Sequence, residues 1–169
     1  SGHSLEFDGT NDYVLIGDSN SLDLTGAFTI SIWMQSGGAQ SNRYLLSKRN
    51  DGGVDNVYSV IYGYAANQAQ FYASGNGFGY PGSSSNVNIP DADWHLVTYS
   101  YDGGKYSVYR DGTLINSYNS TTNISTSTNN LLLGSFNAAG YYFDGLMDDV
   151  RIYNTALSGG DIAYMYDSN

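Results

Sequence analysis

The stretch HLVTYSYDGGKYSVYRDGTLINSY, residues 95–118, decides the fold class. Val97, Tyr99 and Tyr101 alternate with smaller or more polar residues, as in a strand that is buried on one face. Two short turns follow, Asp102–Gly104 and Asp111–Gly112, and each is followed by another alternating segment. Asp-Gly pairs between alternating segments are typical of tight hairpins. The stretch therefore predicts three antiparallel strands in a meander.

The same alternation recurs along the chain. In FTISIWMQ, residues 28–35, the side chains of Phe28, Ile30, Ile32 and Met34 share one face. Only Ser158–Tyr166 predicts a helical turn, with Ser158 at its N-cap. Many short strands without alternating helices predict an all-β antiparallel sandwich. Further strands are expected at Tyr44–Lys48, Tyr58–Tyr64, Gln70–Ala73, Leu131–Ser135 and Leu146–Tyr153.

The composition agrees with a single β domain. The chain has 169 residues with 21 Gly and 17 Tyr, and Glu6 is the only glutamate among its 16 acidic residues. Aspartate and glycine favour turns, whereas tyrosine favours strands. Ser1–His3 resemble the remnant of a cloning vector, so residues 4–169 are expected to form one domain without a linker or internal repeat.

The composition also excludes several functions. The absence of cysteine excludes thiol catalysis, zinc–thiolate sites and disulfides. A net charge of −10 with a pI of about 4.1 argues against binding to nucleic acid. The sequence contains no apolar run long enough to cross a membrane, so a membrane partner is not expected.

Six segments, taken in order, carry a family resemblance. They are FDGTNDYV (7–14), FTISIWM (28–34), YLLSK (44–48), WHLVTYSYDG (94–103), YRDG (109–112) and LLLGSFNAAGYYFDGLMDDVRIYNTALS (131–158). Over residues 5–166 the chain resembles the laminin-G-like branch of the concanavalin A-like lectin/glucanase superfamily. The resemblance implies a jelly roll of two curved antiparallel sheets. It also implies a structural calcium ion and a carbohydrate- or protein-binding surface on the concave face or rim loops.

Calcium takes about six to eight oxygen ligands. Asp8, Asn11 and Asp12 supply side-chain oxygens within one turn, and Asp148 and Asp149 stand inside an expected strand. The resemblance implies that the first and last strands are neighbours, which would bring Asp148 to Asp8, with Asp149 as the other candidate. A carbonyl group from the turn at residues 23–26 could complete the site. The alternative interpretation is two unrelated features, an Asx turn and a solvated strand edge.

Aromatic residues in loops are the candidates for sugar binding, because sugars stack their C–H faces on such rings. A single tyrosine is more often structural, and a polar loop is more often a solvated hairpin tip. As a group, however, three loops and one strand tryptophan form the expected ligand surface. These residues are Arg49, Asn50, Asp51, Phe78, Tyr80, Tyr141, Tyr142 and Trp33.

We therefore expect a non-catalytic carbohydrate-binding module of a secreted or cell-surface bacterial protein. It would be a monomer that is tethered to a catalytic or adhesin domain. Its partner would be a poly- or oligosaccharide, with neutral glycans favoured by the acidic surface. The alternative is an adhesin or cell-surface domain that binds protein, or a spacer domain, without sugar binding. A glycosidase of the resembled superfamily would carry paired glutamates in an ExDxE pattern, which a chain whose only glutamate is Glu6 cannot provide.

Overall fold

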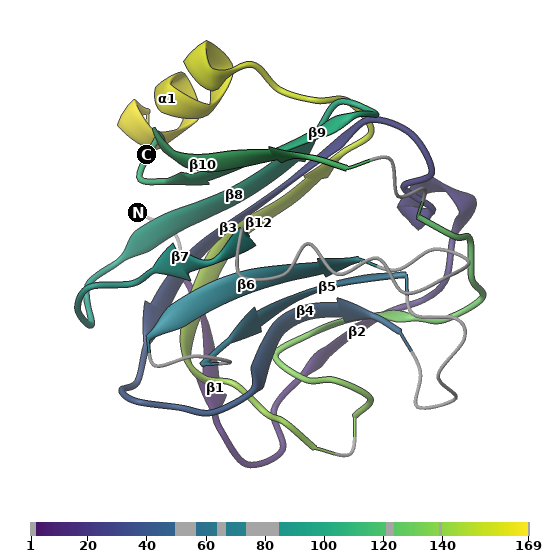
Figure 1. The fold of residues 1–169 in the computed structure, drawn as a ribbon. Coiled ribbons are helices and arrows are strands. Elements are labelled where there is room, and N and C mark those ends of the chain that lie inside the picture. Colours follow the sequence, from purple (N-terminus) through teal and green to yellow (C-terminus); the bar gives the residue numbers. More distant parts are fainter. Residues whose placement is uncertain are drawn as a thin grey trace.

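The computed structural model describes residues 3–49, 57–63, 67–73, 85–120, 124–138 and 140–168. These residues form two antiparallel six-stranded sheets packed face to face (Figure 1). The first sheet has the order β1 (Leu5–Asp8), β12 (Asp144–Tyr153), β3 (Phe28–Ser36), β8 (His95–Tyr101), β9 (Lys105–Arg110) and β10 (Thr113–Asn119). The second has the order β2 (Val14–Ile16), β11 (Leu131–Leu133), β4 (Arg43–Lys48), β5 (Tyr58–Tyr62), β6 (Gln68–Ala73) and β7 (Val87–Asn88). The jelly-roll sandwich is confirmed.

The core lies between the two sheets and follows the alternation in the sequence. Phe28, Ile30, Ile32 and Met34 of β3 are all buried and belong to one apolar cluster. The Phe28 ring packs against Phe71 of the opposite sheet, with the ring centroids 5.7 Å apart. The inward face of β3 is therefore the one that its alternation predicts.

The predicted meander is present as β8, β9 and β10. In the first turn, the Asp102 Oδ1 atom accepts hydrogen bonds from the backbone N–H groups of Gly104 (2.9 Å) and Lys105 (2.8 Å). In the second turn, Asp111 and Gly112 have φ angles of 50° and 72°. The first turn is held by an aspartate side chain and the second by two residues with positive φ angles, and the Asp-Gly pairs in the sequence indicate both turns.

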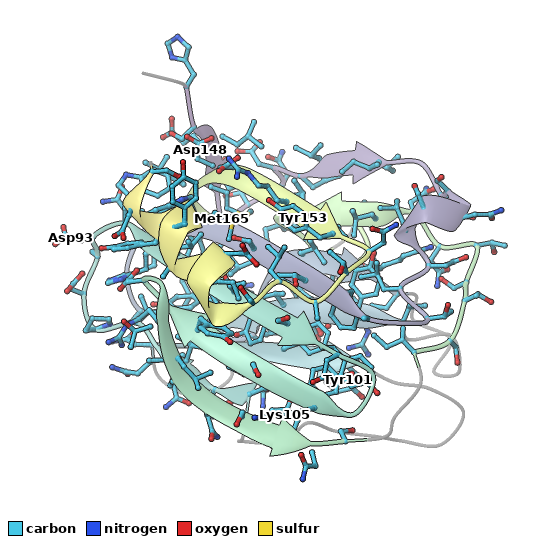
Figure 2. The ribbon with its side chains drawn as sticks, turned by 90° about the horizontal axis from the view of Figure 1, so that it is seen from above. Asp93, Tyr101, Lys105, Asp148, Tyr153 and Met165 are labelled. Atoms are coloured by element: carbon cyan, nitrogen blue, oxygen red, sulfur yellow. The ribbon has the colours of Figure 1, made fainter. Side chains whose placement is uncertain are left out.

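Helix α1 (Gly159–Asp167) lies on the outer face of the first sheet (Figure 1). The Ser158 side chain accepts a hydrogen bond from the Asp161 N–H group, and the Asp161 carboxylate accepts one from the Ser158 N–H group. This reciprocal pair confirms the predicted N-cap. Ile162 and Met165 are buried, with Met165 between the helix and the sheet (Figure 2). A short 3₁₀ helix, η1 (Asn20–Leu22), precedes β3.

No helix in the described ranges has the length and apolar character that a membrane span requires.

Two expected strands end earlier in the structure. β5 ends at Tyr62 because Gly63 has a φ angle of 77°, and β11 ends at Leu133 because Gly134 has a φ angle of 80°. A positive φ angle takes the backbone out of the strand conformation. Strand β12 begins earlier than expected, at Asp144 instead of Leu146.

The segment FDGTNDYV passes from one sheet to the other. Its first residues belong to β1 of the first sheet, and Val14 begins β2 of the second sheet. Gly9 has a φ angle of 73°, which lets the chain leave β1 sharply. The segment is therefore a crossover between the layers of the sandwich.

Candidate functional site: an arginine among aromatic rings on the second sheet

The acidic residues of FDGTNDYV stabilise their own turn. The Asp8 Oδ1 atom accepts hydrogen bonds from the backbone N–H groups of Thr10 (2.8 Å) and Asn11 (3.4 Å). The Asp12 Oδ2 atom accepts one from the Asp8 N–H group at 3.1 Å. This is the Asx-turn geometry that the sequence offered as the alternative to a metal site.

The strand register changes the expected partner of Asp8. Strands β1 and β12 are neighbours, as the resemblance implied, but Asp8 lies opposite Asp144. Asp148 lies four positions further along β12, opposite Trp33 of β3, on the side of the sheet where α1 lies (Figure 2). Four strand residues span about 13 Å. The expected proximity of Asp8 and Asp148 is therefore wrong.

Asp149 is held by an ion pair. It lies in a β-bulge of β12 with a φ angle of 47°, and its Oδ1 atom accepts a hydrogen bond from the Arg151 Nε atom at 2.7 Å. This hydrogen bond is the main cause that raises the pKa of the Arg151 guanidinium. A carboxylate that is engaged by arginine is a poor calcium ligand. Within the described residues, no three His, Cys, Asp or Glu side chains are placed to hold a metal ion. The predicted set does not fit calcium as it stands.

Five side chains form a compact group on the outer face of the second sheet. We call Arg49, Tyr44, Tyr72, Phe136 and Tyr141 the Arg49 cluster. The Arg49 Cζ atom lies 4.8 Å from the ring centroid of Phe136, 5.0 Å from that of Tyr72 and 6.0 Å from that of Tyr44. These distances fit cation–π contacts. The Arg49 Nη1 atom also donates to the Tyr44 hydroxyl at 3.4 Å.

The strand register explains how Tyr44 and Tyr72 reach this face. Tyr72 of β6 lies opposite Ser59 of β5, and Tyr44 of β4 lies opposite Ile61. The residues that alternate with them on β5 and β6, such as Val60 and Phe71, belong to the core. Paired residues on neighbouring strands share a face. The two tyrosines therefore point away from the first sheet.

The loop between β11 and β12 adds the other two rings. The Ser47 hydroxyl donates to the Phe136 carbonyl oxygen at 3.2 Å, and the Tyr44 N–H group donates to the Tyr141 carbonyl oxygen at 3.2 Å. The Phe136 and Tyr141 rings meet edge to face, with their centroids 5.8 Å apart. Tyr141 has a φ angle of 57° and is 51 % exposed. The Tyr141 backbone is thus held by a hydrogen bond, while its ring is accessible to a ligand.

The hydroxyl group of Ser59, on the strand next to the cluster, is buried without a hydrogen-bond partner among the described residues. Buried hydroxyls are usually satisfied by protein or by water. The sheet under the cluster therefore combines ring faces, a cation and a hydroxyl that would gain from a partner.

Some of the predicted sugar-binding residues meet here and others do not. Arg49 and Tyr141 come together in the Arg49 cluster, and Tyr142 is adjacent, with its hydroxyl donating to the Ala138 carbonyl oxygen at 3.0 Å. Asn50, Asp51, Phe78 and Tyr80 lie outside the described residues.

Trp33 requires a correction. It lies on the first sheet, and its ring stacks on Tyr166 of α1, with the centroids 5.5 Å apart and the planes 21° apart. Trp33 therefore contributes to the docking of the helix and takes no part in the Arg49 cluster. The sequence reasoning missed Tyr44, Tyr72 and Phe136. Strand alternation alone indicates that Tyr72 faces away from the core, because Phe71 and Ala73 flank it.

Comparison with known proteins assigns the family. Residues 8–163 match the model of the concanavalin A-like lectin/glucanases superfamily. The chain belongs to this superfamily. None of the curated proteins matches the sequence significantly.

Several solved structures share the fold at low sequence identity. Domain 4 of AbnA, an extracellular GH43 arabinanase from Geobacillus stearothermophilus solved with arabinotriose, is 18 % identical, with a TM-score of 0.70 over 98 % of this chain and 82 % of that one. The CBM40 domain of the Ruminococcus gnavus IT-sialidase is 16 % identical, with a TM-score of 0.73 over 98 % and 97 %. The binding domain of botulinum neurotoxin DC in complex with SialylT is 16 % identical, with a TM-score of 0.70 over 99 % of this chain but only 45 % of that one. These likenesses show the fold.

Proposed function

We propose that this chain is a non-catalytic carbohydrate-binding module and that the Arg49 cluster is its glycan-binding surface. The observation that carries the proposal is the Arg49 guanidinium, which contacts three aromatic rings beside the half-exposed ring of Tyr141. Sugars require ring faces for their C–H groups and polar donors for their hydroxyls, and the cluster brings both to one sheet face.

Each member of the cluster has a separate role in this proposal. The exposed ring of Tyr141 stacks on a sugar ring. Arg49 donates hydrogen bonds to hydroxyl or ring oxygens, and the rings of Phe136 and Tyr72 hold its planar guanidinium in place. A preorganised donor loses less conformational entropy when a ligand binds. The site should therefore bind a glycan with modest affinity and hold the bound sugar in a defined orientation.

The related structures support the proposal of a carbohydrate-binding module. Domain 4 of the arabinanase was solved with arabinotriose and the toxin domain with SialylT, so this fold carries glycans in other proteins. By that analogy we propose that the chain acts outside the bacterial cell, tethered to a larger enzyme or adhesin. Tethering raises the effective affinity of a weak module. The net charge of −10 favours neutral glycans.

A protein-binding domain is the second candidate. It is favoured by Leu114 and Ile115 of the edge strand β10, which are 51 % and 41 % exposed. Exposed apolar side chains on a sheet edge suit contact with another protein. In that case the domain would bind no glycan, and the Arg49 cluster would only pack the loop between β11 and β12 against the second sheet.

A glycan array combined with pull-down on insoluble polysaccharides tests the proposal. The panel should include arabinan, neutral glucans and sialylated oligosaccharides. Tyr141→Ala should abolish retention on whichever glycan the parent binds. Tyr164→Ala should not, because Tyr164 is 75 % exposed on the distant helix α1. If the parent is retained by no glycan in the panel, or if both variants bind like the parent, the Arg49 cluster is not a glycan site.

A further inference from the structure

Lys48, the last residue of β4, is completely buried, unlike most lysines. Its Nζ atom donates hydrogen bonds to the Asp18 Oδ1 atom at 2.7 Å and to the carbonyl oxygens of Ser127 and Asn129, each at 3.0 Å. The Asp23 Oδ1 atom lies 3.4 Å away. Four oxygen atoms therefore surround one ammonium group.

The oxygens come from two segments that are far apart in sequence. Asp18 and Asp23 flank η1, whereas Ser127 and Asn129 precede β11. The two segments are also linked directly, because the Ser127 N–H group donates to Asp23 Oδ1 at 3.3 Å and the Asp18 N–H group donates to the Asn130 Oδ1 atom at 3.1 Å. The ammonium thus lies where two loops meet the end of a central strand.

The surroundings of the ammonium group are negative, and the Lys48 side chain itself is fully shielded from solvent. The side chains of Asp18 and Asp23 are 31 % and 17 % exposed, and the Tyr58 hydroxyl donates to the Leu22 carbonyl oxygen at 3.0 Å. Burial, followed by the charges of Asp23 and Asp18, raises the pKa of the Tyr58 hydroxyl. Two carboxylates held this close repel each other, and a cation between them offsets this repulsion and their partial desolvation.

We propose that these four oxygens form an oxygen-lined cation site and that the Lys48 ammonium occupies it in place of a metal ion. Two carboxylate oxygens and two backbone carbonyl oxygens are ligands of the kind that calcium takes. Asp23 also begins the turn at residues 23–26, whose carbonyl group was expected to assist a calcium site. The chain therefore supplies its own cation here and joins the two loops to β4 without a metal.

The test uses two substitutions of Lys48 and a matched control. Lys48→Met removes the ammonium group but keeps most of the apolar side chain. Lys48→Ala removes both and leaves room for a metal ion between the four oxygen atoms. Lys105→Met is the control, since Lys105 is exposed at the start of β9 (Figure 2). Thermal unfolding is recorded for each protein with EDTA and with millimolar calcium.

Lys48→Met should lower Tm by on the order of 10 °C in both solutions, because the partly buried carboxylates of Asp18 and Asp23 and two carbonyl oxygens lose their common cation. Lys105→Met should stay within about 2 °C of the parent. Lys48→Ala should melt low in EDTA, and calcium should raise its Tm by more than it raises the Tm of the parent, since calcium binds the vacated oxygens. Isothermal titration should then show one more calcium site in Lys48→Ala than in the parent.

Two results would overturn the inference. One is a Tm for Lys48→Met that equals that of the parent, which would mean that the ammonium stabilises nothing. The other is a Lys48→Ala variant whose calcium response matches that of the parent, or which fails to fold even with calcium, because the oxygens would then not form a cation site. A variant that folds only when calcium is added would support the inference.

Discussion

Lys48 and Arg49 are consecutive residues, yet their cationic groups lie in opposite environments. The Lys48 ammonium is enclosed by carboxylate and carbonyl oxygens, whereas the Arg49 guanidinium lies among aromatic rings. One anchors the end of β4, and the other projects from that anchored end into the candidate glycan site. The contacts of Lys48 therefore hold the end of the strand from which the Arg49 side chain extends.

Arg49→Lys should weaken glycan binding about five- to tenfold. Lysine keeps the charge but loses the planar group that lies against the Phe136 and Tyr72 rings. Isothermal titration with the glycan found by the array measures the change. The matched control is Arg110→Lys, since Arg110 belongs to the other sheet and donates to the Asn88 carbonyl oxygen. Equal losses in the two variants would remove Arg49 from the site.

Gly145→Ala should destabilise the fold by about 3 kcal/mol. Gly145 has a φ angle of 143°, and a Cβ atom there would collide with the Gln35 carbonyl oxygen of the neighbouring strand. Gly17→Ala is the control, since its Cβ atom would meet no other atom within 4 Å. Urea unfolding measures both variants, and equal midpoints would show that the backbone at Gly145 adjusts freely.

Tyr166→Ala should cost about 1–2 kcal/mol of stability and leave glycan binding unchanged. The ring of Tyr166 stacks on Trp33 and holds α1 to the first sheet. Chemical denaturation and a binding titration on the same preparation separate the two effects. Reduced glycan affinity in a folded Tyr166→Ala protein would return Trp33 to the candidate ligand surface.

Calcium binding at the crossover segment stays a prediction. Because the pairing of β1 with β12 places Asp144 opposite Asp8, Asp144 is now the residue to substitute in its test. If calcium raises Tm through the crossover segment, Asp144→Asn should remove the rise, because Asp144 lies opposite Asp8. Asp148→Asn should leave the rise intact, since Asp148 lies opposite Trp33. Melting curves with calcium and with EDTA decide. The prediction fails if the Tm of the parent does not respond to calcium.

Stability should fall steeply above about pH 10. Burial is the main cause that raises the pKa of the hydroxyls of Tyr58, Tyr99, Tyr106 and Tyr118 above the ordinary value of 10.0. The folded state therefore keeps these protons while the unfolded state loses them, and rising pH favours unfolding. Circular dichroism and absorbance at the tyrosinate band should change together. Full ionisation of all 17 tyrosines in a chain that keeps its folded spectrum would contradict this.

Local patterns predicted most of the fold because they reflect local forces. The alternation in residues 28–35 marks which side chains are buried, and the Asp-Gly pairs mark where the meander turns. Helix α1 was expected from its cap, because Ser158 and Asp161 form reciprocal hydrogen bonds within three residues. These features depend on neighbours in the sequence, so the sequence alone is sufficient to find them.

The site could be predicted only in part, because it depends on register and on bulges. Nothing local distinguishes Asp144 from Asp148 as the partner of Asp8, since the choice is made by pairing between strands more than a hundred positions apart. The bulge between Tyr44 and Leu46 likewise interrupts the alternation, which by itself would have placed Tyr44 on the same core-facing side as Leu46. Arg49 and Tyr141 were found because loop residues of their type are suited to binding, whatever the register.

The crossover segment has a consequence for the integrity of the sandwich. Strand β1 covers the outer edge of β12, and the segment that follows it leads directly into the other layer. A protease cut near Gly9 would separate the four-residue strand β1 from the rest of the domain and leave the long strand β12 with an unpaired edge. Exposed edges of this kind recruit strands from other molecules. Loss of β1 should therefore promote self-association through the exposed edge of β12.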